Sequence, residues 1–172
     1  GRVTSTLARM DEAAVERFWT LARSQARITA MPGYFGPGTL EVLSPPAWSF
    51  GGTPEEADAL LDLVLDGTKT ATSGALWDYE HEGEPLPEQG TLSILLDGAG
   101  TPRALIEATE VAVVPFDEVG EEHAFLEGEG DRSLAYWREV HERFFVDIAT
   151  HDRGFVPDMP VVLERFHVLY TS

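Results

Sequence analysis

Segments with a helical period and segments with a strand period alternate along this chain, and their order constrains its fold class more than any other feature. Helices are expected over residues 11–26, 53–67 and 133–150, with shorter helical turns at 76–80 and 121–127. Strands are expected over residues 91–96, 103–114 and 161–170, with a short strand or turn at 70–72. This order predicts an α+β fold, in which flanking helices surround a small, mostly antiparallel β-barrel.

The second of these helices has clear signals at both of its ends. Thr53 is a favourable N-cap, Pro54 fits the first helical position, and Glu56 completes a capping box. Gly67 is well placed to end the helix, because glycine readily adopts the left-handed conformation that helix C-termini commonly use. The helix is therefore expected to stop just before Lys69.

The length of 172 residues suits one domain, and a hydrophobic content of 43% is enough for a substantial core. Residues 31–52 are rich in proline and glycine and have neither a helical nor a strand period. Their aromatic residues suggest that this irregular segment is packed and could wall a pocket. We expect residues 1–46 to supply a lead-in, a helix and this segment, packed on a main domain formed by residues 47–172.

The formal net charge of −18 limits the partners that the chain can bind. Nucleic-acid binding draws much of its affinity from phosphates neutralised by Lys and Arg, so the charge favours a small ligand over a long polyanion. The chain has no cysteine, which excludes disulfides and cysteine-based zinc sites. It has no apolar run of membrane-spanning length and opens with no signal segment, so we expect a cytoplasmic protein without a membrane partner. Nothing in the sequence calls for an obligate protein partner.

Lys69 is the only lysine in a chain that has eleven arginines. A lysine amine can lose its proton when it is buried, whereas arginine stays charged. A neutral Lys69 could take a proton from a nearby hydroxyl, of which Thr70, Thr72 and Ser73 are candidates. The end of the preceding helix favours the charged amine, so desolvation would have to outweigh it. A charged Lys69 would instead hold a carbonyl or a phosphate, or cap the free carbonyls of that helix.

A second group of candidates lies at residues 127–132, whose sequence is Glu-Gly-Glu-Gly-Asp-Arg. The two glycines let the backbone approach another group closely, and either Glu127 or Glu129 could exchange a proton opposite Lys69. Arg132 lies near the start of a helix, where positive charge is unfavourable. Its position predicts a contact with a ligand or a salt bridge to a neighbouring carboxylate.

Aromatic residues offer surfaces on which a base could stack. Trp77 and Tyr79 lie near the lysine in sequence, and Trp48 and Trp137 are further candidates, although such residues are more often part of a core. The histidines have no metal-ligand spacing, and the chain lacks a phosphate loop, a dinucleotide fingerprint and a serine-hydrolase motif. We therefore expect neither a metal nor another cofactor.

The order of these segments resembles the ASCH domain, a relative of the PUA-like fold. The resemblance covers residues 47–170 and rests on the Gly-x-Lys-x-x-Thr motif at 67–72, the segment at 127–138 and the last strand after Met159. It implies a small PUA-like barrel with a cleft for RNA or modified nucleosides. Residues 47–172 would form this ASCH domain, in a member longer than the small ones.

Some small members of that family remove an acyl group from acylated cytidine with a Lys, a Thr and a Glu. The resemblance places these on Lys69, Thr72 and Glu127, with Glu129 as the alternative glutamate. Thr72 would attack the acyl carbon, Lys69 would take its proton, and Glu127 would protonate the leaving amine. Residues expected to contact the base and sugar are Arg132, Glu129, Thr70, Ser73, Trp77, Tyr79 and Trp48.

The alternative is a domain that binds or cuts short single-stranded RNA, with Lys69 and Arg132 on phosphates. The two functions differ in their response to salt, since phosphate contacts weaken steeply as salt rises.

Overall fold

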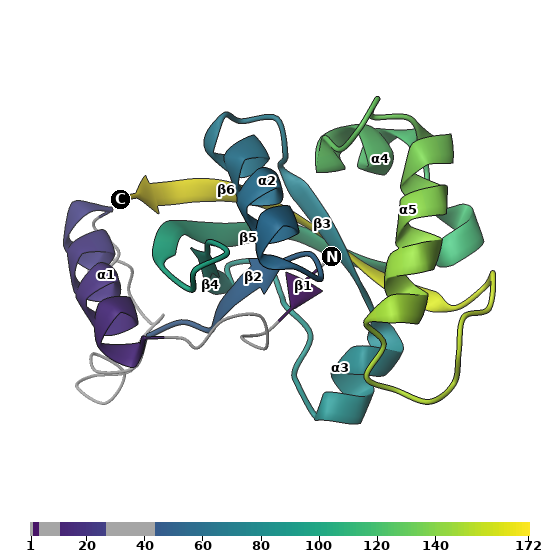
Figure 1. Cartoon of the computed structure of the whole chain (residues 1–172), viewed down its shortest axis with the longest axis horizontal. Coiled ribbons are helices and arrows are strands. Elements are labelled where there is room, and N and C mark those ends of the chain that lie inside the picture. Colours follow the sequence, from purple (N-terminus) through teal and green to yellow (C-terminus); the bar gives the residue numbers. More distant parts are fainter. Residues whose placement is uncertain (1, 4–10, 27–43) are drawn as a thin grey trace.

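The computed structural model describes residues 2–3, 11–26 and 44–172, which form a sheet with helices packed against it (Figure 1). The strands are β1 (Arg2–Val3), β2 (Ala47–Phe50), β3 (Ala71–Ala75), β4 (Leu92–Leu96), β5 (Pro102–Pro115) and β6 (Pro160–Thr171). The helices are α1 (Glu12–Gln25), α2 (Pro54–Leu65), α3 (Leu76–Glu82), α4 (Glu121–Glu127) and α5 (Leu134–Asp147), with a 3-10 turn η2 at Phe116–Glu118. None of the helices in these ranges is both long and apolar enough to cross a membrane.

The six strands form one sheet in the order β1-β2-β4-β5-β6-β3. Only β2 and β4 run parallel, and the other neighbours are antiparallel. The fold class is therefore α+β with a mostly antiparallel sheet, as expected, but the sheet is open rather than closed into a barrel. Just before β3, the Thr70 amide donates to the Leu126 carbonyl over 2.8 Å, which joins the start of this edge strand to α4.

Helices cover the two faces of the sheet and create three apolar clusters. Helix α1 buries Val15, Phe18, Trp19 and Ala22 against one face of β4 and β5. Helix α2 packs Leu61 and Val64 with Trp48, Phe50 and Phe166 on another part of the sheet. Helices α4 and α5 pack against β3 and β6 through Ala124, Trp137, Phe145 and Val161. Beside this cluster, Ser73 Oγ on β3 donates to Glu127 Oε2 over 2.8 Å, which joins the segment at 127–132 to β3.

The Pro/Gly-rich segment differs from the expectation where the structure describes it. Residues 47–50 form strand β2, although no strand period was recognised there. These four residues form a strand because they pair with β1 on one side and β4 on the other, and because Trp48 and Phe50 are both fully buried. Residues 31–43 lie outside the described residues, and the division of the chain at residue 46 stays a prediction.

Candidate active site

Lys69 lies in the short connection between α2 and β3, and its side chain turns inward. Gly67 adopts a φ of 87°, and the amides of Thr68 and Lys69 both donate to the Leu63 carbonyl, at 2.9 and 3.0 Å. The backbone rather than the amine therefore satisfies the helix end. The Lys69 side chain is 0% exposed, and its Nζ lies 3.1 Å from Glu127 Oε1 and 3.1 Å from Glu129 Oε2.

Glu127 is the centre of a buried polar network. Its Oε2 accepts hydrogen bonds from Ser73 Oγ at 2.8 Å, from His123 Nε2 at 2.8 Å and from the indole N–H of Trp137. Its Oε1 faces Lys69 and lies 3.5 Å from His141 Nε2. Both oxygens are thus surrounded by donors from β3, α4 and α5, and the side chain is 0% exposed. Such saturation is how a buried carboxylate is normally tolerated.

Two glycines allow the segment that carries the glutamates to pack this closely. Gly128 has a φ of 75°, and a Cβ there would lie 2.7 Å from the Thr68 carbonyl oxygen. Gly130 has a φ of 58°, and a Cβ there would lie 2.4 Å from the Tyr136 ring. Residues with side chains at these positions would collide with the Lys69 connection or with α5. The close backbone approach expected from the sequence is therefore present at both glycines.

The ionisation of the pair follows from its surroundings. Burial lowers the pKa of Lys69, but the charges of Glu127 and Glu129 and their hydrogen bonds outweigh it, and the pKa is raised above 10.5. Burial likewise raises the pKa of Glu127, yet Lys69 and His141 with the His123 hydrogen bond hold that pKa well below 4.5. Desolvation thus fails to neutralise Lys69, so the amine is charged at neutral pH and is not a resting base.

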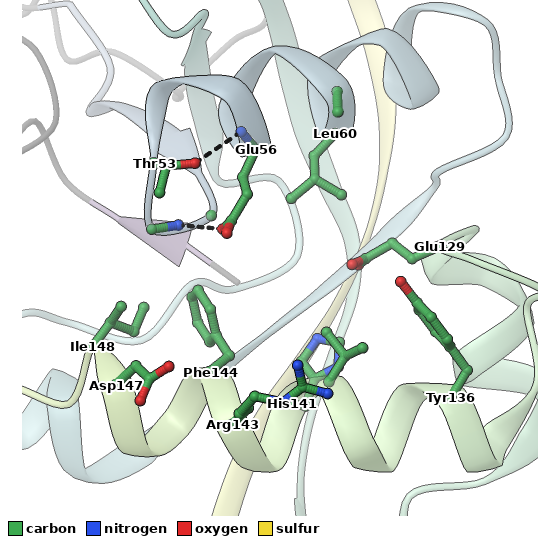
Figure 2. Close-up of a pocket in the computed structure, with 14 residues that line it drawn as sticks. Thr53, Glu56, Leu60, Glu129, Tyr136, His141, Arg143, Phe144, Asp147 and Ile148 are labelled. Atoms are coloured by element: carbon green, nitrogen blue, oxygen red, sulfur yellow. Dashed lines mark hydrogen bonds between the residues drawn. The ribbon is translucent and has the colours of Figure 1, made fainter.

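A pocket of ≈ 600 Å³ opens between the start of α2 and α5, next to this network (Figure 2). Leu60 and Ala59 from α2 face Val140, Phe144 and Ile148 from α5 or its end, which makes the walls largely apolar. Glu129 and the hydroxyl of Tyr136 lie at the same end of it (Figure 2). His141 also lines the pocket, so Glu129 and His141 connect the buried charges to a space where a ligand fits.

Thr72 and Ser73 lie on opposite faces of β3, because side chains alternate along a strand. Ser73 is the hydroxyl that reaches Glu127, over 2.8 Å. Thr72 is only 2% exposed, and its Oγ1 makes no hydrogen bond to any described residue. Neither hydroxyl lines the pocket. The structure thus brings Lys69, Glu127, Glu129 and Ser73 together, with Thr72 near them in sequence but outside their hydrogen-bond network.

Arg132 is engaged within the protein. Its Nε donates to the Phe125 carbonyl at 3.0 Å, its Nη2 donates to the Thr68 carbonyl at 3.4 Å, and the guanidinium stacks 3.6 Å from the centre of the Phe125 ring. These contacts explain why a cation lies near a helix start, since it satisfies the Phe125 carbonyl at the end of α4 and the Thr68 carbonyl before β3. The predicted salt bridge to a neighbouring carboxylate is absent among the described residues, and Arg132 does not line the pocket.

The aromatic candidates lie away from the pocket. Trp48 is fully buried and packs edge-on against Phe50 at 5.1 Å. Trp77 contacts His151 and Arg153, and Tyr79 is a buried residue of α3 beside Gly74. Thr70 uses its backbone amide and carbonyl to join β3 to α4 and β6. In this structure none of these four residues offers a surface to a ligand in the pocket.

Sequence reasoning missed three residues that complete the site, His123, Tyr136 and His141, and it offered Trp137 only as a surface for stacking. His123 and Glu127 are four residues apart on α4, and Trp137 and His141 are four apart on α5, where their rings stack at 4.3 Å. Same-face spacing of polar and aromatic residues on two buried helix faces was the available signal. It gave no indication that both helices face one carboxylate.

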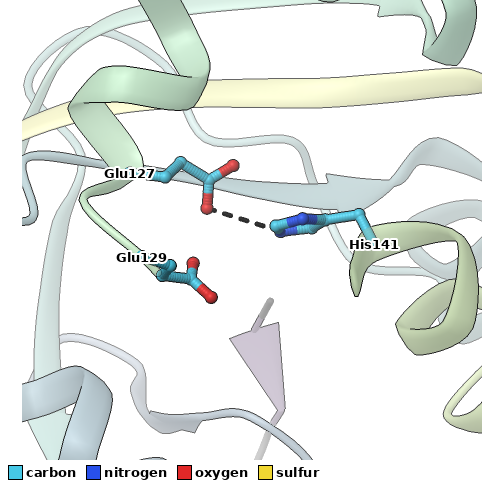
Figure 3. A group of neighbouring side chains, drawn as sticks. All are labelled: Glu127, Glu129 and His141. Atoms are coloured by element: carbon cyan, nitrogen blue, oxygen red, sulfur yellow. Dashed lines mark ion pairs between the residues drawn. The ribbon is translucent and has the colours of Figure 1, made fainter. Parts of the chain in front are cut away.

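Glu127, Glu129 and His141 each offer one ligand atom within 4.8 Å of the others, a spacing that could hold a metal ion (Figure 3). Lys69 Nζ, however, already lies 3.1 Å from an oxygen of each carboxylate. A divalent cation bound by these groups would be placed against the ammonium and would be repelled by it. The chemistry of the donor set therefore fits a hydrogen-bonded ion cluster better than a metal centre.

Comparisons with known proteins agree with this architecture. The ASCH domain family matches residues 46–170 of the chain. The crystal structure of protein EF3133 from Enterococcus faecalis V583 is similar, with a TM-score of 0.77 and 36% identity over 92% of this chain and 89% of that chain. An ASCH domain from Lactobacillus crispatus JV V101 has a TM-score of 0.74 and 31% identity, covering 94% of this chain and 96% of that chain. A comparison with curated proteins found no match.

Proposed function

Because the chain belongs to the ASCH domain family, we propose that it is a metal-independent amidohydrolase, which removes an acyl group from a nucleoside bound between α2 and α5. The observation that carries this proposal is the meeting of an apolar pocket with a buried ion cluster at Glu129. Ligand pockets commonly combine apolar walls with a few convergent polar groups, and perturbed pKa values gather at functional sites.

The charges around the pocket favour an uncharged ligand with N–H donors. Glu56, Glu129 and Asp147 line it, and Arg143 is the one arginine among its lining residues. Arg143 is already paired with Glu139 at 3.2 Å on the exposed face of α5. Carboxylates accept hydrogen bonds from the amino group of cytosine, whereas they repel phosphate. A nucleoside of the acylated cytidine type satisfies both conditions.

The ionisation of Lys69 changes the role that we assign to it. A charged ammonium cannot take a proton, and the Lys69 Nζ is buried against Glu127 and Glu129, so we assign it the role of holding the Glu129 carboxylate in place at the pocket. Thr72 remains the proposed nucleophile on the family resemblance: its Oγ1 bonds to no described residue, but it is buried and does not line the pocket, so water is the alternative attacking group. Glu127 is proposed to hold Lys69 in place.

ASCH domains are usually linked to RNA binding, which makes RNA the alternative ligand. Contacts to phosphate by Lys69 and Arg132 find little support, since Lys69 is only 1% exposed and Arg132 donates to backbone carbonyls. The net charge of −18 also opposes a long polyanion. Binding of an RNA segment is therefore treated as the competing outcome of the same experiment.

The test is a hydrolysis assay on a panel of N-acylated cytidines, with a short single-stranded RNA in parallel. We expect the wild type to release the carboxylic acid at a rate that changes little with salt, and Thr72→Val to abolish release. The exposed Thr20→Val on α1 is the matched control and should behave as wild type. Retention of turnover by Thr72→Val would assign the attack to water.

Absence of turnover on every acylcytidine would contradict the proposal. RNA binding or cleavage that weakens steeply with salt would then identify the domain as an RNA-binding one.

A further inference from the structure

We propose that Glu129, and not Glu127, is the carboxylate that meets the ligand and exchanges protons with it, an assignment that rests on the proposed hydrolytic function. The resemblance to acylcytidine hydrolases points to Glu127 instead. The two glutamates are separated by one residue and both contact Lys69, so their different surroundings decide between them.

Glu129 has the access that such a role needs. It lines the pocket between α2 and α5, and its side chain keeps 12% of its surface exposed. Lys69 holds its Oε2 at 3.1 Å, whereas its Oε1 accepts no hydrogen bond from any described residue. One oxygen is therefore fixed by the protein and the other is left for a ligand or water.

Glu127 lacks that access. Its side chain is 0% exposed, and it is not among the residues that line the pocket. Ser73, His123 and Trp137 donate to one of its oxygens, and Lys69 donates to the other. A proton exchange with a ligand would require several of these buried bonds to break. Glu127 is therefore a positioning residue that acts through Lys69.

The pocket also supplies a second polar group beside Glu129. The Tyr136 hydroxyl and the Glu129 carboxylate converge at the same end of the pocket, while the aliphatic side chains of Leu60 and Ile148 lie further along it (Figure 2). Gly130 makes this possible, since a Cβ there would collide with the Tyr136 ring. An amide carbon placed at this end would have its leaving nitrogen within reach of Glu129 and its apolar part along the helix walls.

One proton, taken up and then released by Glu129, is enough for the reaction. Glu129 takes the proton of the attacking O–H group, whose oxygen bonds to the acyl carbon and pushes an electron pair onto the carbonyl oxygen. When the carbonyl re-forms, the C–N bond breaks, its electron pair goes to nitrogen, and Glu129 returns the proton there. With water as the attacking group the products are the carboxylic acid and the free amine. With Thr72 an acyl ester forms first, and water cleaves it by the same transfers.

The test compares Glu129→Gln with Glu127→Gln in the full chain, at a temperature where circular dichroism shows both to be folded. Glu129→Gln is expected to lower kcat by about 100-fold or more and to abolish the acid limb of the pH–rate profile, since an amide cannot take the proton. Glu127→Gln should keep that limb. Glu142→Gln, which removes an exposed charge from the outside of α5, is the matched control and should retain the wild-type kcat.

A Glu129→Gln enzyme that keeps the acid limb, or a kcat within about threefold of wild type, would overturn the assignment. If the wild type hydrolyses no acylcytidine, the hydrolytic function fails, and proton exchange by Glu129 fails with it. Contact with the ligand is then decided by titration with cytidine alone. If Glu129→Gln weakens cytidine binding about tenfold or more, Glu129 contacts the ligand as proposed. If binding is unchanged, Glu129 does not contact the ligand and the assignment is wrong.

Discussion

Lys69→Met is expected to lower the free energy of unfolding by about 3–5 kcal/mol, the range found when one partner of a buried ion pair is removed. Methionine fits a similar volume but leaves Glu127 as a buried carboxylate without its main positive partner. The loss should appear as a lower midpoint of urea-induced unfolding with an unchanged slope.

The matched control is the double variant Lys69→Met/Glu127→Gln, which removes both charges of the pair. It should recover a large part of the loss, because no uncompensated carboxylate stays buried. A double variant that is destabilised by the sum of the two single losses would show that the two residues do not interact, and would contradict the account.

Glu127→Gln is expected to cost a comparable amount near neutral pH, about 3–5 kcal/mol, and this cost should depend on pH. The pKa of Glu127 is held well below 4.5 in the folded protein, so its charge contributes stability that is fully present above pH 4.5. That contribution is lost as the pH falls through the folded pKa. Urea unfolding at several pH values should therefore show wild type and variant converging in acid.

At the alkaline end the same pair has the opposite dependence. The pKa of Lys69 is raised above 10.5, so its contribution to stability is present below pH 10.5 and is lost as the pH rises through the folded pKa.

For the Glu127→Gln experiment, Glu142→Gln is the control for removing a surface charge, and it should change the unfolding free energy by no more than about 0.5 kcal/mol. A wild-type advantage over Glu127→Gln that stays constant from neutral pH into acid would contradict the assigned pKa shift.

Local signals explain which parts of the fold could be predicted. The limits of α2 follow from the Thr53 cap, whose Oγ1 accepts from the Glu56 amide at 3.1 Å, and from Gly67 at its end. Strand β2 was missed because its four residues gain their structure from β1 and β4, which are distant in sequence. A segment of four residues between prolines and glycines is too short for its alternation of side chains to reveal such pairing.

The candidate site likewise has features that local sequence signals predict and features that depend on distant residues. The sole lysine and the segment at 127–132 could be singled out from composition and spacing, and the structure brings them into contact. The charge of Lys69 could not be predicted, because it depends on carboxylates 58 and 60 residues away. The position of Arg132 predicted a contact with a ligand or a neighbouring carboxylate, and in the structure its side chain donates to the Phe125 and Thr68 carbonyls.

The most direct test of the account uses the fact that Lys69 is the only lysine. Protein grown with lysine carrying ¹³C at Cε gives one lysine resonance, whose shift reports the protonation of this amine. The account predicts no titration of that resonance between pH 6 and 10, and a change in its shift when an acylated cytidine is added. A titration midpoint near or below pH 7 would show a neutral amine in the resting protein, and would contradict the charged Lys69 on which the proposed site is built.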